Sequence, residues 1–115
     1  MGLQSLLGTR SQEQNGVVTI ALSGDLDLAT APILSEELAP FEGNGVSTII
    51  LDLQDLSFID STGMHTFLEA RNRAMSNGQR LLVRGANPAA QRHIKIVGLQ
   101  FLLDDPEHDV ESPPG

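Results

Sequence analysis

Three residue types are missing from this 115-residue chain: cysteine, tryptophan and tyrosine. Without cysteine, the chain cannot form disulfides, thiolate zinc sites or cysteine nucleophiles. With four phenylalanines as its only aromatic residues, it has little on which bases or sugars could stack. Basic residues are also scarce, since seven Lys and Arg stand against 15 Asp and Glu and give a formal net charge of −8. This balance disfavours nucleic-acid binding, because phosphate contacts need clustered Lys and Arg.

Charges of the two signs are confined to different parts of the chain. Residues 11–70 contain ten acidic residues and no Lys or Arg, whereas residues 71–103 contain six basic residues and no acid. Residues 104–115 add five more acids. Two interpretations are open: these segments form solvated faces of a small protein, or an acidic surface steers a basic partner.

Long apolar runs are absent as well. No stretch approaches the ~20 apolar residues that cross a bilayer, and the N-terminus lacks the basic start and apolar run of a secretion signal. We therefore expect a soluble, cytoplasmic protein.

Two kinds of pattern alternate along the chain. Short β-branched or apolar runs predict strands at 17–22, 46–53, 81–83 and 99–103, with a first strand at 3–8 that pairs antiparallel with 17–22 across a polar turn at 11–16. Apolar residues at helical spacing predict helices after Thr30, after the Asp60–Gly63 turn and over 87–98. Thr30 is the expected N-cap of the first helix. Leu3, Leu6 and Leu7 are expected core contacts.

This order of elements predicts a single α/β domain over residues 1–103. Strands that alternate with helices favour parallel pairing with helical crossovers. We expect a small, mixed and mostly parallel β-sheet of four to five strands, packed with three or more helices. Residues 104–115 form an acidic tail that ends in Pro-Pro-Gly, and we expect this tail to be disordered.

Functional residues of an open α/β sheet gather past the carboxyl ends of its strands, where two turns are expected here. These turns are Gly24–Asp27 and Asp60–Gly63. Ser61 and Thr62 open a helix in the second turn, so Ser61 is either a simple N-cap or a hydroxyl open to modification. A phosphate on Ser61 would add about −1.5 to −2 charges, tolerated by the helix N-terminus and repelled by Asp60. We expect such a phosphate to change the surface potential more than the fold.

Enzymatic and metal chemistry find no support in the sequence. No nucleophile–base pair is visible, and Ile59 stands where a nucleophile elbow needs glycine. His65, His93 and His108 lack the spacing of metal ligands, and His65 is expected to be a half-buried surface histidine. We therefore expect no catalytic residue, no metal and no cofactor.

Two motifs and three flanking segments together carry a family resemblance. They are Gly24-Asp25-Leu26-Asp27, Ile49-Ile50-Leu51-Asp52-Leu53, Phe58-Ile59-Asp60-Ser61-Thr62-Gly63-Met64, Asn87-Pro88-Ala89 and Val97-Gly98-Leu99. With them, residues 14–103 resemble the bacterial STAS-domain anti-sigma factor antagonists. His65 and the acidic tail depart from the family pattern, and His65 would alter the fit of a partner or add pH sensitivity.

The resemblance implies a phosphorylation switch rather than a catalyst. The unphosphorylated protein would bind an anti-sigma factor that is also a serine kinase, and so release a sigma factor for transcription. That kinase would phosphorylate Ser61 and break the complex, and a phosphatase would be the candidate to reset it. The residues implied to contact the partner are Asp25, Asp27, Asp60, Thr62, Gly63 and Met64.

Two other functions remain open on the sequence. STAS-like domains also serve as non-phosphorylated subunits of membrane transport systems for lipids or anions, and in such a subunit Ser61 would be only an N-cap. A response-regulator receiver with Asp52 as phosphoacceptor fits poorly, because that fold needs about five helices and a Lys after its last strand. Here Lys95 lies inside a predicted helix. Oligomeric state and nucleotide binding are not determined by these patterns.

Overall fold

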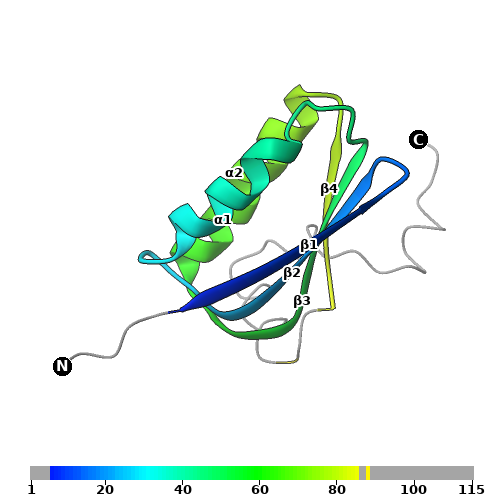
Figure 1. Ribbon diagram of the computed structural model, residues 1–115. Helices are drawn as coiled ribbons and strands as arrows, with labels where there is room; N and C mark the ends of the chain where they lie inside the picture. The colour runs from blue at the N-terminus through cyan, green and yellow to red at the C-terminus, as the bar shows by residue number, and fades with distance from the viewer. Residues whose placement is uncertain (1–5, 86–87, 89–115) are drawn as a thin grey trace.

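Four strands lie side by side in chain order in the computed structural model, which describes residues 6–85 and 88 (Figure 1). The elements are β1 (Leu7–Gln14), β2 (Val17–Leu26), α1 (Ala31–Leu38), the 3-10 turn η1 (Ala39–Phe41), β3 (Thr48–Ile59), α2 (Ser61–Ser76) and β4 (Arg80–Arg84). β1 pairs antiparallel with β2, and both the β2–β3 and β3–β4 pairs are parallel. This is the mixed, mostly parallel sheet that the sequence predicts.

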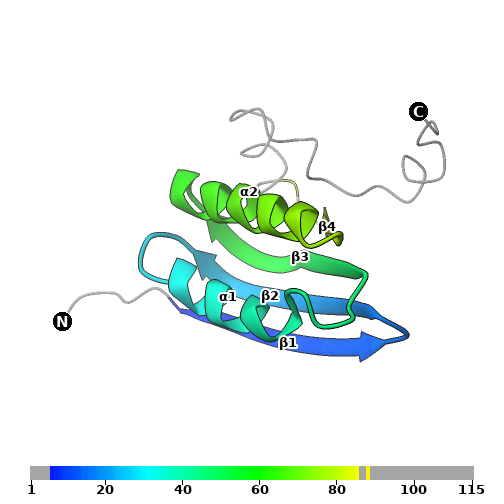
Figure 2. The same cartoon turned by 90° about the horizontal axis from the view of Figure 1, so that it is seen from above.

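Both helices cover the same face of the sheet (Figures 1 and 2). Buried side chains therefore alternate along the strands, as Val18, Ile20 and Leu22 do in β2. Leu34 and Leu38 of α1 and Phe67 of α2 close the core from the other side. No helix within residues 6–85 is long and apolar enough to cross a membrane.

The first strand differs from its prediction. It begins at Leu7 and continues through the polar residues 11–14, which the sequence places in a turn. A two-residue turn at Asn15 and Gly16, both with positive φ (56° and 80°), brings Gln14 opposite Val17 and holds the residues before it in the strand. Polar residues suit this strand because it lies at the edge of the described sheet.

The remaining predictions can be checked only where they fall within the described residues. The helices after Thr30 and after Asp60 are confirmed, as are the strands at 17–22, 46–53 and 81–83. Leu7 packs against the core, whereas Leu6 is exposed and is not the core contact we expected. Of the predicted helix over 87–98 only Pro88 is described, and it is helical; the strand at 99–103, the tail at 104–115 and Leu3 lie outside the described residues.

Candidate functional site

The two predicted turns lie at one end of the sheet, but they are shorter than predicted: residues 24–26 are the end of β2, and residues 61–63 are the start of α2. Because β2 and β3 are parallel neighbours, their carboxyl ends coincide, and Leu26 is in register with Ile59. The N–H of Asp60 donates to the carbonyl of Leu26 over 3.2 Å, which ties the second turn to the first. The site therefore combines residues that are about thirty-five positions apart in the chain.

Asp60 is the N-cap of α2, and Ser61 is the first residue of the helix. The Asp60 Oδ1 atom accepts a hydrogen bond from the N–H of Gly63 over 2.9 Å, and the Asp60 carbonyl accepts one from Met64 N–H over 3.0 Å. The interpretation of Ser61 as the capping residue is thus wrong, because a carboxylate one position earlier already fills that role. Ser61 is exposed at the start of the helix.

Gly63 and Met64 form the floor of the site. A Cβ atom at Gly63 would lie 2.7 Å from the Leu26 carbonyl oxygen and 2.9 Å from Ile59 Cγ1, so only glycine lets α2 approach the first turn this closely. Met64 is buried in the core beside it. Of the predicted partner-contact residues, these two lie in the interior and shape the site from beneath.

The Gly24–Asp27 segment, which ends β2 and begins the loop to α1, is held by its own polar groups. Gly24 has a φ of 91°, and a Cβ atom there would clash with the carbonyl oxygen of Leu6. The Asp27 Oδ1 atom accepts hydrogen bonds from the N–H groups of Ala29 (3.0 Å) and Thr30 (3.1 Å). Asp27 is therefore a positioning residue of the turn, whatever else it contacts.

Thr30 stabilises this turn through its side chain, whereas the sequence predicted that it would cap α1. It stands at the predicted N-cap position of α1, but its side chain makes no capping bond. Instead its Oγ1 donates to the carbonyl of Asp25 over 2.8 Å and accepts from the N–H of Asp27 over 3.0 Å. The side chain is buried, at 1% exposure. The available signal was the spacing of Asp27 and Thr30, which suits a side-chain-bonded turn as well as a helix cap.

The surface of the site is acidic. Asp25, Asp27 and Asp60 are partly exposed around the exposed Ser61, and Thr62 is partly exposed beside it. Nothing in residues 6–85 groups three or more metal-ligating side chains. A hydroxyl at the positive end of a 16-residue helix, framed by carboxylates, can accept a phosphate and so alter the local charge.

His65 lies one helical turn beyond Ser61. Its side chain is 66% exposed, more than the half-buried position that the sequence suggested, because it lies on the solvent side of α2. Its Nδ1 is 3.6 Å from Glu69 Oε2, one further turn along the helix. Ser61, His65 and Glu69 thus follow one exposed line, at the i, i+4 spacing of helix neighbours.

Known proteins share both the sequence pattern and the architecture of this chain. A profile of the STAS domain matches residues 9–112. The Staphylococcus aureus anti-sigma-B factor antagonist is 29% identical over 97 residues, which are 84% of this chain and 90% of that protein.

The fold is also that of solved structures. The unphosphorylated form of the anti-sigma factor antagonist SpoIIAA superposes with a TM-score of 0.75 at 20% identity, covering 94% of this chain and all of SpoIIAA. The phosphorylated form of Bacillus SpoIIAA gives 0.65 at 22% identity, over 91% and 98%. The murine anion transporter Slc26a9 gives 0.69 at 18% identity, and the match covers 92% of this chain and 19% of the transporter. The chain therefore belongs to the STAS domain family.

Proposed function

We propose that this chain is an anti-sigma factor antagonist that is switched by phosphorylation of Ser61. The unphosphorylated protein binds an anti-sigma factor with serine kinase activity, and that partner phosphorylates Ser61 and is then released. The chain acts as ligand and substrate in the cytoplasm, and a phosphatase resets it. Sigma-factor-dependent transcription is the process that it regulates.

One observation carries this proposal: Asp60 caps α2, which leaves the exposed Ser61 hydroxyl without that structural task. A kinase can then modify Ser61 with no loss of the cap. The curated antagonist from Staphylococcus aureus supports the function, and a fold shared with both phosphorylation forms of SpoIIAA supports the switch.

The charges of the site give the physical reason for release. A phosphate adds about −1.5 to −2 charges directly beside Asp60, inside the surface that the partner would cover. Bringing the partner back would then require a doubly charged group to lose its water next to a like charge, which is costly. In the unphosphorylated protein, the carboxylates of Asp25 and Asp60 attract a basic partner.

Binding to the purified anti-sigma factor of the same bacterium, measured by calorimetry, tests this proposal. Ser61→Ala should bind as tightly as the wild type and resist release in the presence of ATP, whereas Ser61→Asp should bind at least about tenfold more weakly. Asn72→Asp, which adds a charge at an exposed position of α2 away from the site, is the matched control and should bind like the wild type. Equal affinity of Ser61→Asp and the wild type would contradict an electrostatic switch at Ser61.

The shared fold of the Slc26a9 domain favours one second candidate, a non-phosphorylated interaction subunit of a membrane transport system. In that case Ser61 would remain unmodified, and the chain would co-purify with a membrane complex rather than with a soluble kinase. Affinity purification from detergent-solubilised membranes and from the soluble fraction separates the two candidates.

A further inference from the structure

A phosphate on Ser61 would stand beside a fixed negative charge. The Asp60 Oδ1 atom is held by the N–H of Gly63 over 2.9 Å, so this carboxylate stays at the start of α2 when Ser61 is modified. The N–H groups of a helix end offer only partial positive charge, whereas a phosphate carries about −1.5 to −2. A side chain with a full positive charge would be the stronger ligand of this phosphate.

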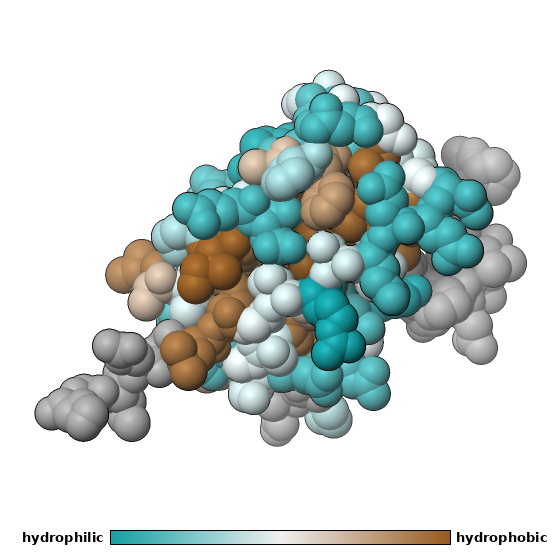
Figure 3. All heavy atoms as spheres, viewed as in Figure 1, coloured by the Kyte–Doolittle hydropathy of each residue, from teal (hydrophilic) through white to brown (hydrophobic). Residues whose placement is uncertain are grey.

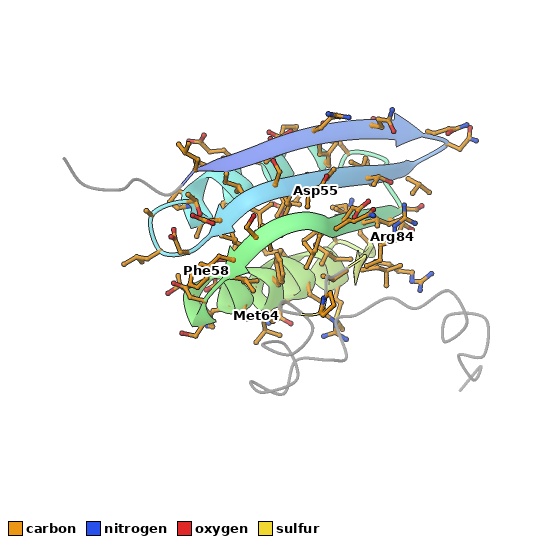
Figure 4. All side chains as sticks on the ribbon, turned by 90° about the horizontal axis from the view of Figure 1, so that it is seen from below. Asp55, Phe58, Met64 and Arg84 are labelled. Atoms are coloured by element: carbon orange, nitrogen blue, oxygen red, sulfur yellow. The ribbon has the colours of Figure 1, made fainter. Side chains whose placement is uncertain are left out.

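The arginines of the described strands lie away from Ser61. β4 pairs with Thr48–Asp52, the first part of β3, which is at least about 20 Å from the carboxyl end of that strand. Arg10 of β1 pairs with the middle of β2. Figure 4 shows Arg84 of β4 well apart from Met64, which marks the start of α2. These strands therefore bring no arginine to the phosphate.

His65 lies where a cation is needed. It is the one residue between positions 11 and 70 whose side chain can carry a full positive charge. It follows Ser61 by four residues on α2, and residues at this spacing are surface neighbours, with Cβ atoms about 5–6 Å apart. The next cation on the helix, Arg71, is about 15 Å further along the axis from Ser61. Within residues 6–85, His65 is thus the cation placed to reach the phosphate.

In the unmodified protein, His65 faces a carboxylate of its own helix. Its Nδ1 lies 3.6 Å from Oε2 of Glu69, and the two side chains are 66% and 57% exposed. β3, β4 and α1 contact α2, but the charged group at ion-pair distance from His65 within residues 6–85 is Glu69. Figure 3 shows hydrophilic side chains along much of the helical layer. An exposed pair of this kind contributes little to stability, so His65 can leave it for a group of higher charge.

We propose that His65 binds the phosphate on Ser61: the protonated imidazole turns from Glu69 and donates a hydrogen bond to a phosphate oxygen. This inference rests on the proposed function and adds to it the residue that receives the phosphate. The direction of the helix favours the contact, because side chains on a helix lean toward its N-terminus, which is the side of Ser61. The greater charge of the phosphate favours it over Glu69.

This ion pair makes the strength of the switch depend on pH. A protonated His65 cancels one of the charges that the phosphate adds, so a returning partner meets a smaller net negative charge. When the imidazole is neutral, the full charge of the phosphate opposes the partner. Release should therefore be most complete above the pH range in which histidines titrate, and weaker below it.

Phosphorus NMR on the full chain, with phosphoserine built in at position 61 during translation, tests the contact. A neighbouring cation favours the dianion, so the phosphate should take up its second proton at a pH about half a unit lower in the wild type than in His65→Gln. His65→Lys keeps a positive charge and should restore the lower value. Asn72→Lys adds the same charge at an exposed position further along α2, and as the matched control it should change nothing.

Binding to the purified anti-sigma factor of the same bacterium tests the consequence. Phosphorylation raises the Kd by a factor that should shrink between about pH 8 and about pH 6, and by roughly threefold more in the wild type than in His65→Gln. Proton uptake by the phosphate itself acts in both proteins, so the difference between them reports His65.

The outcomes separate this inference from the proposed function. If the phosphate takes up its proton at the same pH in the wild type and in His65→Gln, the inference is overturned, and the proposed function stands as long as phosphate releases the partner. If phosphate leaves partner binding unchanged, the proposed function is overturned, and the NMR titration still decides whether His65 binds the phosphate. An effect that His65→Lys fails to restore would show that the charge of His65 is not what the phosphate meets, and would also overturn the inference.

Discussion

The two ends of the sheet fix their loops by the same means but differ in what they leave exposed. At the end opposite the site, the buried Gln79 donates from Nε2 to the carbonyls of Phe41 (2.9 Å) and Val46 (2.8 Å). At the site, Asp27, Thr30 and Asp60 likewise bond backbone groups of their loops. Beside the loops of the site, the side chains of Leu6, Phe58 and Ser61 are exposed, and Ser61 is the proposed point of modification.

One end of the sheet thus serves stability alone, whereas the other combines stabilising residues with those assigned to function. Gln79 sits among buried groups, and its removal should cost stability alone. At the site, the residues that fix the loops are neighbours of the residues that we assign to the partner. Substitutions there should therefore fall into two groups, those that loosen the turns and those that change binding while the fold stays intact.

Gly63→Val should have the largest effect. The new side chain would collide with the Leu26 carbonyl oxygen and with Ile59, and α2 would have to move away from the first turn. We expect a loss of about 3 kcal/mol in the free energy of unfolding, measured by urea denaturation, together with weaker partner binding. Thr62→Val places the same valine one residue earlier, at a partly exposed position, and should be well tolerated. A wild-type denaturation curve for Gly63→Val would show that the contact with Leu26 is unimportant.

Gln79→Met should come next and tests the end opposite the site. Methionine fills a similar volume but leaves two carbonyls without the donor that they have now, at an expected cost of about 2 kcal/mol. Gln12→Met, at an exposed position of β1, is the control and should change little. Partner affinity should be unchanged in both variants after correction for the folded fraction. Weaker binding by fully folded Gln79→Met would contradict the claim that this end of the sheet affects stability alone.

Thr30→Val should cost somewhat less. It keeps the shape of the buried side chain but removes the hydroxyl that joins Asp25 and Asp27, and we expect a loss of about 1.5 kcal/mol. Binding should weaken as well, because Asp25 is then less firmly placed. Thr30→Ser restores the hydroxyl and should recover most of the affinity. If valine and serine bind equally well, the hydroxyl does not position the turn.

The smallest effects should come from the pair that decides which residue caps α2. Asp60→Ala removes the oxygen bonded to Gly63 N–H and should cost about 1 kcal/mol. Ser61→Ala should change the free energy of unfolding by less than about 0.5 kcal/mol, as at an ordinary exposed position. Thermal melts of the two variants side by side check this order. If Ser61→Ala lost more stability than Asp60→Ala, Ser61 and not Asp60 would be the capping residue.

Most of the fold was predictable because its signals are local. β-branched runs, the turn glycines and helical spacing located β2, β3, β4, α1 and α2, and the alternation of strands and helices predicted the mostly parallel sheet. β1 was misplaced because its polar residues resemble a turn, and pairing with β2 decides their conformation. Burial of Gly63 and Met64 depends in the same way on a contact with a distant segment, so their motif could not reveal it.

The site was predictable to a similar degree and for similar reasons. Strand order alone was enough to bring Gly24–Asp27 beside Asp60–Gly63. The roles of Asp60 and Thr30 were not, since Asp, Ser and Thr can all cap a helix and only geometry shows which oxygen faces which N–H. The exposure of Leu6 and Phe58 also escaped prediction, because apolar residues in or next to strands are ordinarily read as core.

Peptide mass spectrometry on the protein isolated from its own cells tests the phosphorylation switch most directly. Samples of the wild type and of Ser61→Ala should be taken across growth and stress conditions. We predict a single phosphoryl group on Ser61 in the wild type and none in the variant. A phosphoryl group on Thr62, or no phosphate under any condition, would contradict the switch and leave Ser61 as an ordinary first residue of α2.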